Sequence, residues 1–117
     1  MIADFYRILS RTVAPEHALY EVVLPTSCAV YRGHFPKEPV APGVCSLQMI
    51  HELAEDMLGR SLDINYIKQC RYTGLLLPDN ERVLQVELCI TNSDSTTLKA
   101  TISAEGKTYI KLCAELS

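Results

Sequence analysis

The chain has 117 residues, 48% apolar and 21% charged, a balance that excludes a disordered or low-complexity protein. Its net charge of −3 at pH 7 argues against nucleic acid as the main ligand. No run approaches 18 consecutive apolar residues, so we expect no membrane span. The length fits a single domain covering residues 1–117.

The cysteines predict the redox compartment. Their number is odd and none forms a C-x-x-C pair: Cys28, Cys45, Cys70, Cys89 and Cys113. We therefore expect reduced, mostly buried thiols in a cytoplasmic protein. The cysteines and the three histidines show no zinc spacing, and we expect neither a metal nor a cofactor.

The start of the chain combines a helical pattern with a strand pattern. Four apolar residues fall at i, i+3, i+4 and i+7, namely Ile2, Phe5, Tyr6 and Leu9. This spacing predicts a short amphipathic helix, which Pro15 ends. Residues 17–24 predict a strand with Tyr20, Val22 and Leu24 on one face.

Residues 25–43 form a long segment that contains four prolines and two glycines. It also carries apolar residues that anchor a loop, among them Tyr31 and Phe35. Long loops with such anchors in compact domains are often functional, so we expect an ordered loop rather than a linker.

Residues 42–58 predict one long helix, because Pro42 suits its first turn and Gly59 suits its end. One face carries an apolar stripe at Leu47, Ile50, Leu53, Ala54, Met57 and Leu58. The first two turns are apolar around the axis, at Val44, Cys45, Leu47, Met49 and Ile50. We expect this end to be buried on nearly every side, with Gln48 as its only long polar side chain.

The second half of the chain predicts strands. Residues 64–72 form the first, and a turn follows at 77–80. Three later runs alternate apolar and polar residues around residues 84–90, 98–104 and 110–116, joined by short turns at 92–94 and 105–106. This pattern predicts an antiparallel meander with one wet face, and the helix is the natural cover for the dry face. The fold class is therefore α+β, a curled antiparallel sheet around one central helix.

The motif that carries chemistry is GHFPKEPVAPGV at residues 33–44. It resembles the signature of the 3-hydroxyacyl-[acyl carrier protein] dehydratases, roughly G-H-F-P-x-x-P-x-x-P-G-V. The resemblance extends to Leu77-Pro78-Asp79, which is similar to the family's P-G-D turn, and covers about residues 17–90. It implies the hotdog fold, which agrees with the pattern above. It also implies homodimers, or trimers of dimers, with two active sites at the dimer interface.

One departure concerns catalysis. The family carries an acidic residue fourteen positions after the histidine, where this chain has Gln48. The chain also lacks the P-H-R-x-P-F-L element that longer family members carry before the first strand, so it resembles short dehydratase-like proteins of accessory lipid or polyene pathways.

The resemblance implies a role for each residue type in dehydration. A base near pH 7 must remove the C2 proton, and His34 fits. The thioester oxygen needs a donor, which the Gly43 N–H at the helix start supplies. Gln48 cannot give a proton, so His34 either returns the C2 proton to the leaving hydroxyl while Gln48 orients it, or the site lacks an acid. Pro42, Val44 and Phe35 complete the expected substrate site, Phe35 as a loop anchor or as part of an acyl channel.

Other residues receive weaker roles. Glu52, one turn after Gln48, is an alternative acid, but we expect it to be solvated beside Glu55. Cys45 has no base at a recognisable spacing, and His17 and His51 belong to no motif, so we expect structural roles for them.

The expected substrate is a 3-hydroxyacyl chain on an acyl carrier protein or on coenzyme A. A carrier protein is acidic, and four basic residues near the motif segments form the candidate docking patch: Arg32, Lys37, Lys68 and Arg71. Two alternatives stay open, a hotdog thioesterase and a non-catalytic acyl-binding or heterodimer partner.

Overall fold

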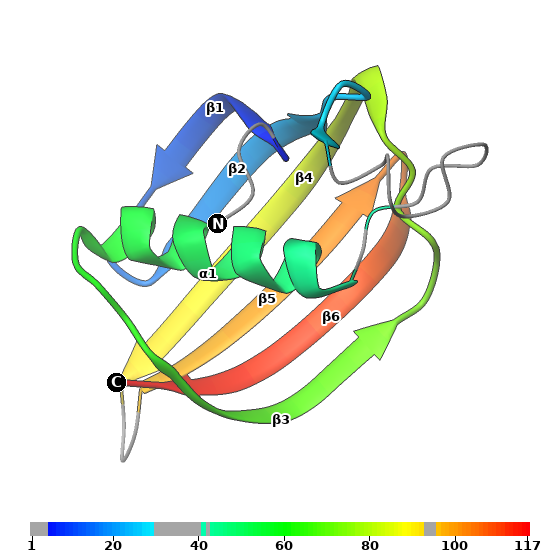
Figure 1. Ribbon diagram of the computed structural model, residues 1–117. Coiled ribbons are helices and arrows are strands. Elements are labelled where there is room, and N and C mark those ends of the chain that lie inside the picture. Colours follow the sequence, from blue (N-terminus) through cyan, green and yellow to red (C-terminus); the bar gives the residue numbers. More distant parts are fainter. Residues whose placement is uncertain (1–4, 30–40, 42, 93–95) are drawn as a thin grey trace.

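The computed structural model describes residues 5–29, 41, 43–92 and 96–117. The described part consists of one helix and one six-stranded antiparallel sheet (Figure 1). In chain order the elements are β1 (Arg7–Val13), β2 (His17–Leu24), α1 (Gly43–Leu58), β3 (Ile64–Tyr72), β4 (Asp79–Asn92), β5 (Thr96–Ala104) and β6 (Lys107–Leu116). This α+β architecture confirms the predicted class.

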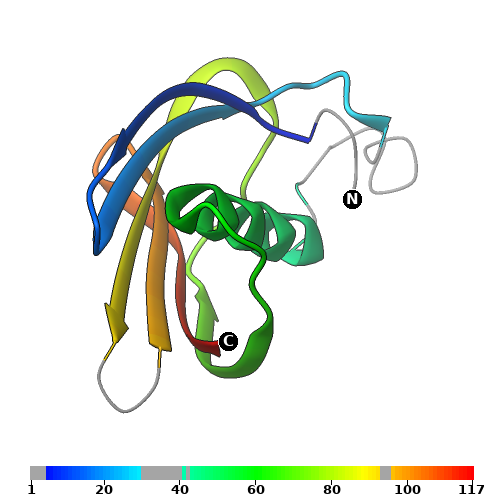
Figure 2. The same ribbon diagram turned by 90° about the vertical axis from the view of Figure 1, so that its left-hand side faces the viewer.

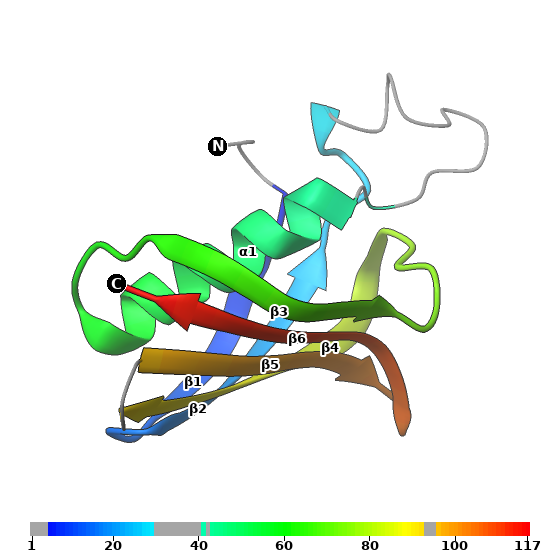
Figure 3. The same cartoon turned by 90° about the horizontal axis from the view of Figure 1, so that it is seen from below.

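The strand order is β1-β2-β4-β5-β6-β3, so β1 and β3 are the two edge strands. The sheet curls, and α1 lies in its hollow, as the side view shows (Figure 2). From below, β3 runs beside β6 at one edge of the sheet (Figure 3). Register shifts in β1–β2, β2–β4 and β3–β6 mark irregularities of the kind that increase strand twist and bend a sheet.

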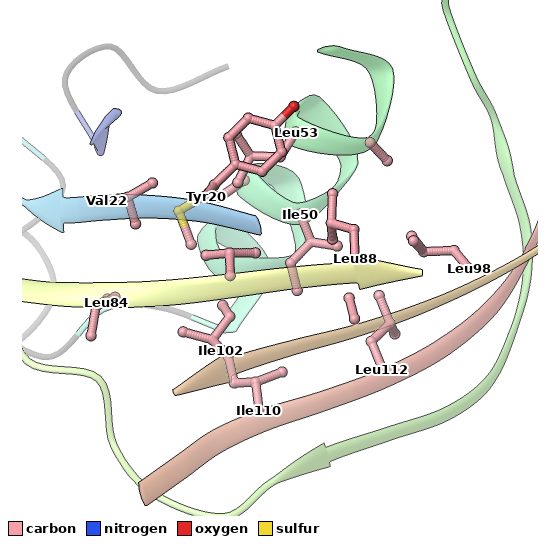
Figure 4. Packing of buried hydrophobic residues seen from close by; sticks show 14 of the residues in the cluster. Tyr20, Val22, Ile50, Leu53, Leu84, Leu88, Leu98, Ile102, Ile110 and Leu112 are labelled. Carbon is pink, nitrogen blue, oxygen red and sulfur yellow. The ribbon is translucent and has the colours of Figure 1, made fainter. Parts of the chain in front are cut away.

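The core fills the space between the sheet and the helix (Figure 4). Tyr20, Val22 and Leu24 of β2 are buried on one face, as predicted. The three later period-two runs behave in the same way, because their apolar members on β4, β5 and β6 are buried. Leu88 lies close to Ile50 of α1 in Figure 4.

The helix ends as predicted, because Gly59 adopts φ 68°, a left-handed conformation that glycine tolerates at a helix C-terminus. Within the described part of the chain, no helix is long and apolar enough to cross a membrane.

The predicted N-terminal helix is wrong over the described residues. Residues 7–13 form β1, which pairs antiparallel with β2. A strand here supplies hydrogen-bonding partners to the open edge of β2, and that tertiary gain outweighs a weak local helical pattern. Phe5 is buried in the core and Tyr6 packs against the core, so these two rings make tertiary contacts and do not form one face of a helix.

The turns follow the sequence closely. Glu105 and Gly106 both have positive φ, 53° and 79°, as a tight hairpin turn requires. Residues 93–95 of the other predicted turn lie outside the described residues. The strand after the 77–80 turn begins earlier than expected, because Asp79 already belongs to β4.

Candidate active site

A cavity of about 260 Å³ lies between the first half of α1 and the segment that precedes β1. The helix contributes side chains spaced along one face, and the N-terminal segment contributes two aromatic rings. The lining residues are Phe5, Tyr6, Val44, Cys45, Gln48, Met49 and Glu52. Two predicted site residues, Gln48 and Val44, therefore line the same cavity.

Glu52 connects the polar groups of this cavity. The Tyr6 hydroxyl donates to Glu52 Oε1 at 2.8 Å, and Gln48 Nε2 donates to Glu52 Oε2 at 3.2 Å. Burial and the hydrogen bond to Glu52 raise the pKa of Tyr6 well above the usual value of 10. Each carboxylate oxygen of Glu52 thus accepts a separate donor.

This arrangement corrects the expectation that Glu52 is solvated beside Glu55. Glu52 is half-buried and engages Tyr6 and Gln48, whereas Glu55 accepts the Leu62 backbone N–H at 2.9 Å. The difference arises because the N-terminal segment folds back over the helix, which the sequence pattern did not indicate.

Cys45 lines the cavity as a thiol whose pKa is raised by burial. A raised pKa lowers the thiolate fraction, so the structure gives no support for a nucleophilic role. No disulfide joins any of the five cysteines. Cys28 and Cys45 are buried, whereas Cys70, Cys89 and Cys113 are only half-buried.

The first turns of α1 are not enclosed on all sides, contrary to expectation. Val44 is 75% exposed and Gln48 is exposed, whereas Cys45, Met49 and Ile50 are buried. Among the described residues the sheet covers only one side of the helix, and Val44 and Gln48 lie on another side.

Gly43, the predicted oxyanion donor, begins the helix directly beside Tyr72 at the end of β3. A Cβ atom at position 43 would lie 2.9 Å from the Tyr72 hydroxyl and 3.1 Å from its Cζ. Burial, followed by a hydrogen bond with Cys70, raises the pKa of Tyr72 to about 12. Tyr72 therefore remains a neutral phenol against the helix start.

Five predicted site residues lie outside the described residues: His34, Phe35, Pro42, Arg32 and Lys37. Lys68 and Arg71 are described, on β3. Lys68 Nζ lies 3.3 Å from Glu115 Oε1, so its charge already forms an ion pair. Arg71 is exposed and lies opposite Lys111 of β6 in the ladder.

Sequence reasoning missed Phe5 and Tyr6 as cavity residues. Their spacing predicts the apolar face of a short N-terminal helix. The local sequence does not distinguish such a face from aromatic residues that contact a helix far along the chain. The neighbouring Met49 was recognised as apolar, but its place in the cavity depends on the same chain reversal.

Comparison with protein families places the chain among dehydratases. The family model ApeI-like, described as ApeI dehydratase, matches residues 10–111. Two curated relatives are 3-hydroxyacyl-[acyl-carrier-protein] dehydratases FabZ. The chain is 30% identical over 84 residues to the protein of Levilactobacillus brevis and 26% identical over 84 residues to that of Clostridium botulinum. Each match covers 66% of this chain, and 57% and 58% of the respective relative, so the chain spans less than two thirds of their length.

Solved structures share the fold. The dehydratase heterocomplex ApeI:P from Xenorhabdus doucetiae superimposes with a TM-score of 0.83 at 20% identity, covering 94% of this chain and 96% of that chain. A hypothetical thioesterase with coenzyme A from Streptococcus pneumoniae TIGR4 gives 0.70 at 14% identity, covering 95% and 86%. At these identities the likeness concerns the fold alone. The curled sheet around one helix is the hotdog fold, as the motif implied.

Proposed function

Because the chain belongs to the ApeI-like dehydratase family, we propose that it removes water from a 3-hydroxyacyl thioester to give a trans-2-enoyl thioester in fatty acid or related lipid or polyene biosynthesis. The observation that carries the proposal is the family match over residues 10–111. The cavity at the helix start supports it, since that cavity contains Gln48, the residue at the family's acidic position.

In the proposed reaction His34 removes the proton from C2 of the substrate. The Gly43 N–H, at the positive end of the α1 dipole, stabilises the charge that develops on the thioester oxygen. The C2=C3 double bond forms as the C3–O bond breaks. His34 passes the same proton to the departing hydroxyl, which leaves as water.

The acyl group is carried by an acyl carrier protein or by coenzyme A. For an acidic carrier protein we propose that Arg71 and Lys111 form the centre of the docking surface, together with the predicted Arg32, Lys37 and Lys68. Like charges directly opposite each other in a sheet destabilise it, so a basic pair here is consistent with a binding role. Arg71→Glu should weaken carrier binding at low salt but leave turnover of a small soluble thioester unchanged. Unchanged carrier binding would refute the patch.

The experiment for the reaction is steady-state dehydration of a 3-hydroxyacyl thioester, followed through the absorbance of the conjugated product. His34→Ala should reduce turnover by at least about a hundredfold, the lower range of general acid–base contributions. His17→Ala is the matched control, because His17 is an exposed residue of β2 whose Nε2 lies 3.5 Å from Oε2 of Glu87 on β4. Wild-type turnover by His34→Ala would refute the assignment.

A second candidate, thioester hydrolysis, is favoured by one observation, the Glu52 carboxylate in the cavity. A carboxylate that activates water is what such a reaction requires. The same assay distinguishes the two, because hydrolysis releases a free thiol without a conjugated product. A non-catalytic subunit, alone or in a heterodimer, would give neither signal.

A further inference from the structure

The orientation of the Gln48 amide follows from its neighbour. Gln48 and Glu52 are separated by one helical turn, and Gln48 Nε2 lies 3.2 Å from Glu52 Oε2. An ionised carboxylate only accepts hydrogen bonds, whereas an amide has a donor end and an acceptor end. Glu52 therefore selects the rotamer in which the amide nitrogen faces it, and the carbonyl oxygen remains for another partner.

Glu52 is itself held in place from a different element. Tyr6, in the segment before β1, donates to its other oxygen at 2.8 Å. Because the pKa of Tyr6 is raised by burial and by Glu52, its hydroxyl stays a donor at physiological pH. Glu52 is half-buried at the cavity wall, and its hydrogen bond with Tyr6 is partly buried, so water competes less with that bond than with the exposed one to Gln48.

We propose that Glu52 is a positioning residue that fixes the Gln48 amide, so that the cavity offers the substrate's 3-hydroxyl a hydrogen-bond acceptor where related enzymes offer an acid. This inference rests on the proposed dehydration. The hydroxyl donates its hydrogen to the Gln48 carbonyl, which leaves the hydroxyl's oxygen lone pairs free to accept the proton that His34 has taken. The proton travels from C2 through His34 to the hydroxyl, and neither Gln48 nor Glu52 gains or loses one.

The first test replaces the carboxylate. Glu52→Gln keeps the shape of the side chain but offers Gln48 both a donor and an acceptor, so the amide loses its fixed orientation. We expect kcat to fall about tenfold, the effect of one hydrogen bond to a charged group, with KM changed less than twofold. Glu55→Gln is the matched control. Glu55 lies three residues after Glu52 on the same helix but accepts the Leu62 backbone N–H, so this substitution should leave kcat unchanged.

The second test uses a pH profile, which a merely structural role of Glu52 would not change. Gln48→Glu places two carboxylates side by side, and like charges at this distance make the pair share a proton. That proton is an acid for the leaving hydroxyl, so kcat should gain a new limb that falls as the pH rises. In Gln48→Glu/Glu52→Gln the new carboxylate receives an amide donor, stays ionised, and the limb should disappear. The other titratable groups lining the described cavity are Tyr6 and Cys45.

Failure of the inference and failure of the proposed function give different results. Wild-type kcat for Glu52→Gln, with His34→Ala inactive, refutes the positioning role and leaves the dehydration intact. No dehydration by the wild type refutes both. If Glu52→Gln does not fold, Tyr6→Phe provides the second variant, because it removes the hydroxyl that donates to one oxygen of Glu52. We expect it to lower kcat by less than Glu52→Gln does. An unchanged kcat, together with an unchanged pH profile in the Gln48→Glu background, would refute the inference.

Discussion

Glycine at position 43 is explained by space rather than by backbone conformation. Its φ is not among the positive values, so alanine would fit the backbone, but a methyl group there would meet the Tyr72 hydroxyl at 2.9 Å. Tyr72 is half exposed, which allows its ring to move at some cost. The start of α1 and the end of β3 are thus fitted to each other through this one contact.

Gly43→Ala should therefore destabilise the protein by about 1–2 kcal/mol, the usual range for overpacking against a side chain that can shift. In a Tyr72→Ala background the same substitution should cost nothing. Urea unfolding of the four proteins of this double-mutant cycle measures the coupling. Equal costs in both backgrounds would show that Tyr72 does not restrict position 43.

The second half of α1 is tied to the first two strands through Asp56. Its Oδ2 accepts the Tyr20 hydroxyl at 2.6 Å and the Arg11 Nε at 3.1 Å, which connects the helix to β2 and β1. Burial, followed by the hydrogen bond to Asp56, raises the pKa of Tyr20 to about 12. The buried Tyr20 side chain and its hydrogen bond, rather than the exposed ion pair, carry most of the stabilisation, because solvent screens the pair.

Asp56→Ala should reduce the free energy of unfolding by about 1–3 kcal/mol, since it leaves the Tyr20 hydroxyl without its partner. Arg11→Ala should cost less than Asp56→Ala, because its ion pair is exposed and screened by solvent. Chemical denaturation of both variants at neutral pH measures the two losses in the free energy of unfolding. A larger loss for Arg11→Ala would show that β1 depends on the ion pair.

At the level of elements, sequence periodicity was informative wherever a segment forms a continuous face of the core. β2, whose inward face is buried, has the predicted bounds, and α1 ends at Leu58 as predicted, while Pro42 at its predicted start lies outside the described residues. β3 also has the predicted bounds, although nearly all its residues are exposed. A helix was predicted at the start of the chain from the spacing of Ile2, Phe5, Tyr6 and Leu9. All residues of β1 are exposed, so the strand has no buried face that would impose a period of two. The cavity could also be predicted only in part. Gln48 was identified from a motif, whereas the hydrogen bond from Tyr6 to Glu52 joins residues far apart in the chain, and a local sequence pattern does not indicate such a contact.

At the level of the whole molecule, apolar surface collects beside the helix start and along β3. Val44 is 75% exposed and Tyr66 is 61% exposed, and Leu75, in the connection after β3, is 69% exposed. β3 pairs only with β6 among the described strands, so its other edge presents unpaired backbone groups. An exposed edge next to apolar side chains is typical of a subunit interface.

We therefore expect a dimer or a trimer of dimers in sedimentation at micromolar concentration. Tyr66→Glu should shift the protein toward monomer, because a charge at the interface loses its hydration. Leu9→Glu is the matched control, since Leu9 is 52% exposed on the opposite edge strand β1. A wild-type monomer, or equal effects of both substitutions, would contradict an interface at β3.

The place of β3 in the sheet also has a consequence for folding. β3 precedes β4 in the chain, yet its only described strand partner is β6, which is synthesised after β4 and β5. Strands β4, β5 and β6 follow one another through local pairings, which close with little loss of chain entropy and so form early. Changes at the Glu105-Gly106 turn should then slow folding, whereas changes on β3 should mainly speed unfolding. During synthesis, the apolar face of α1 is made before β3, β4, β5 and β6, so it remains without its full cover until these four strands have followed.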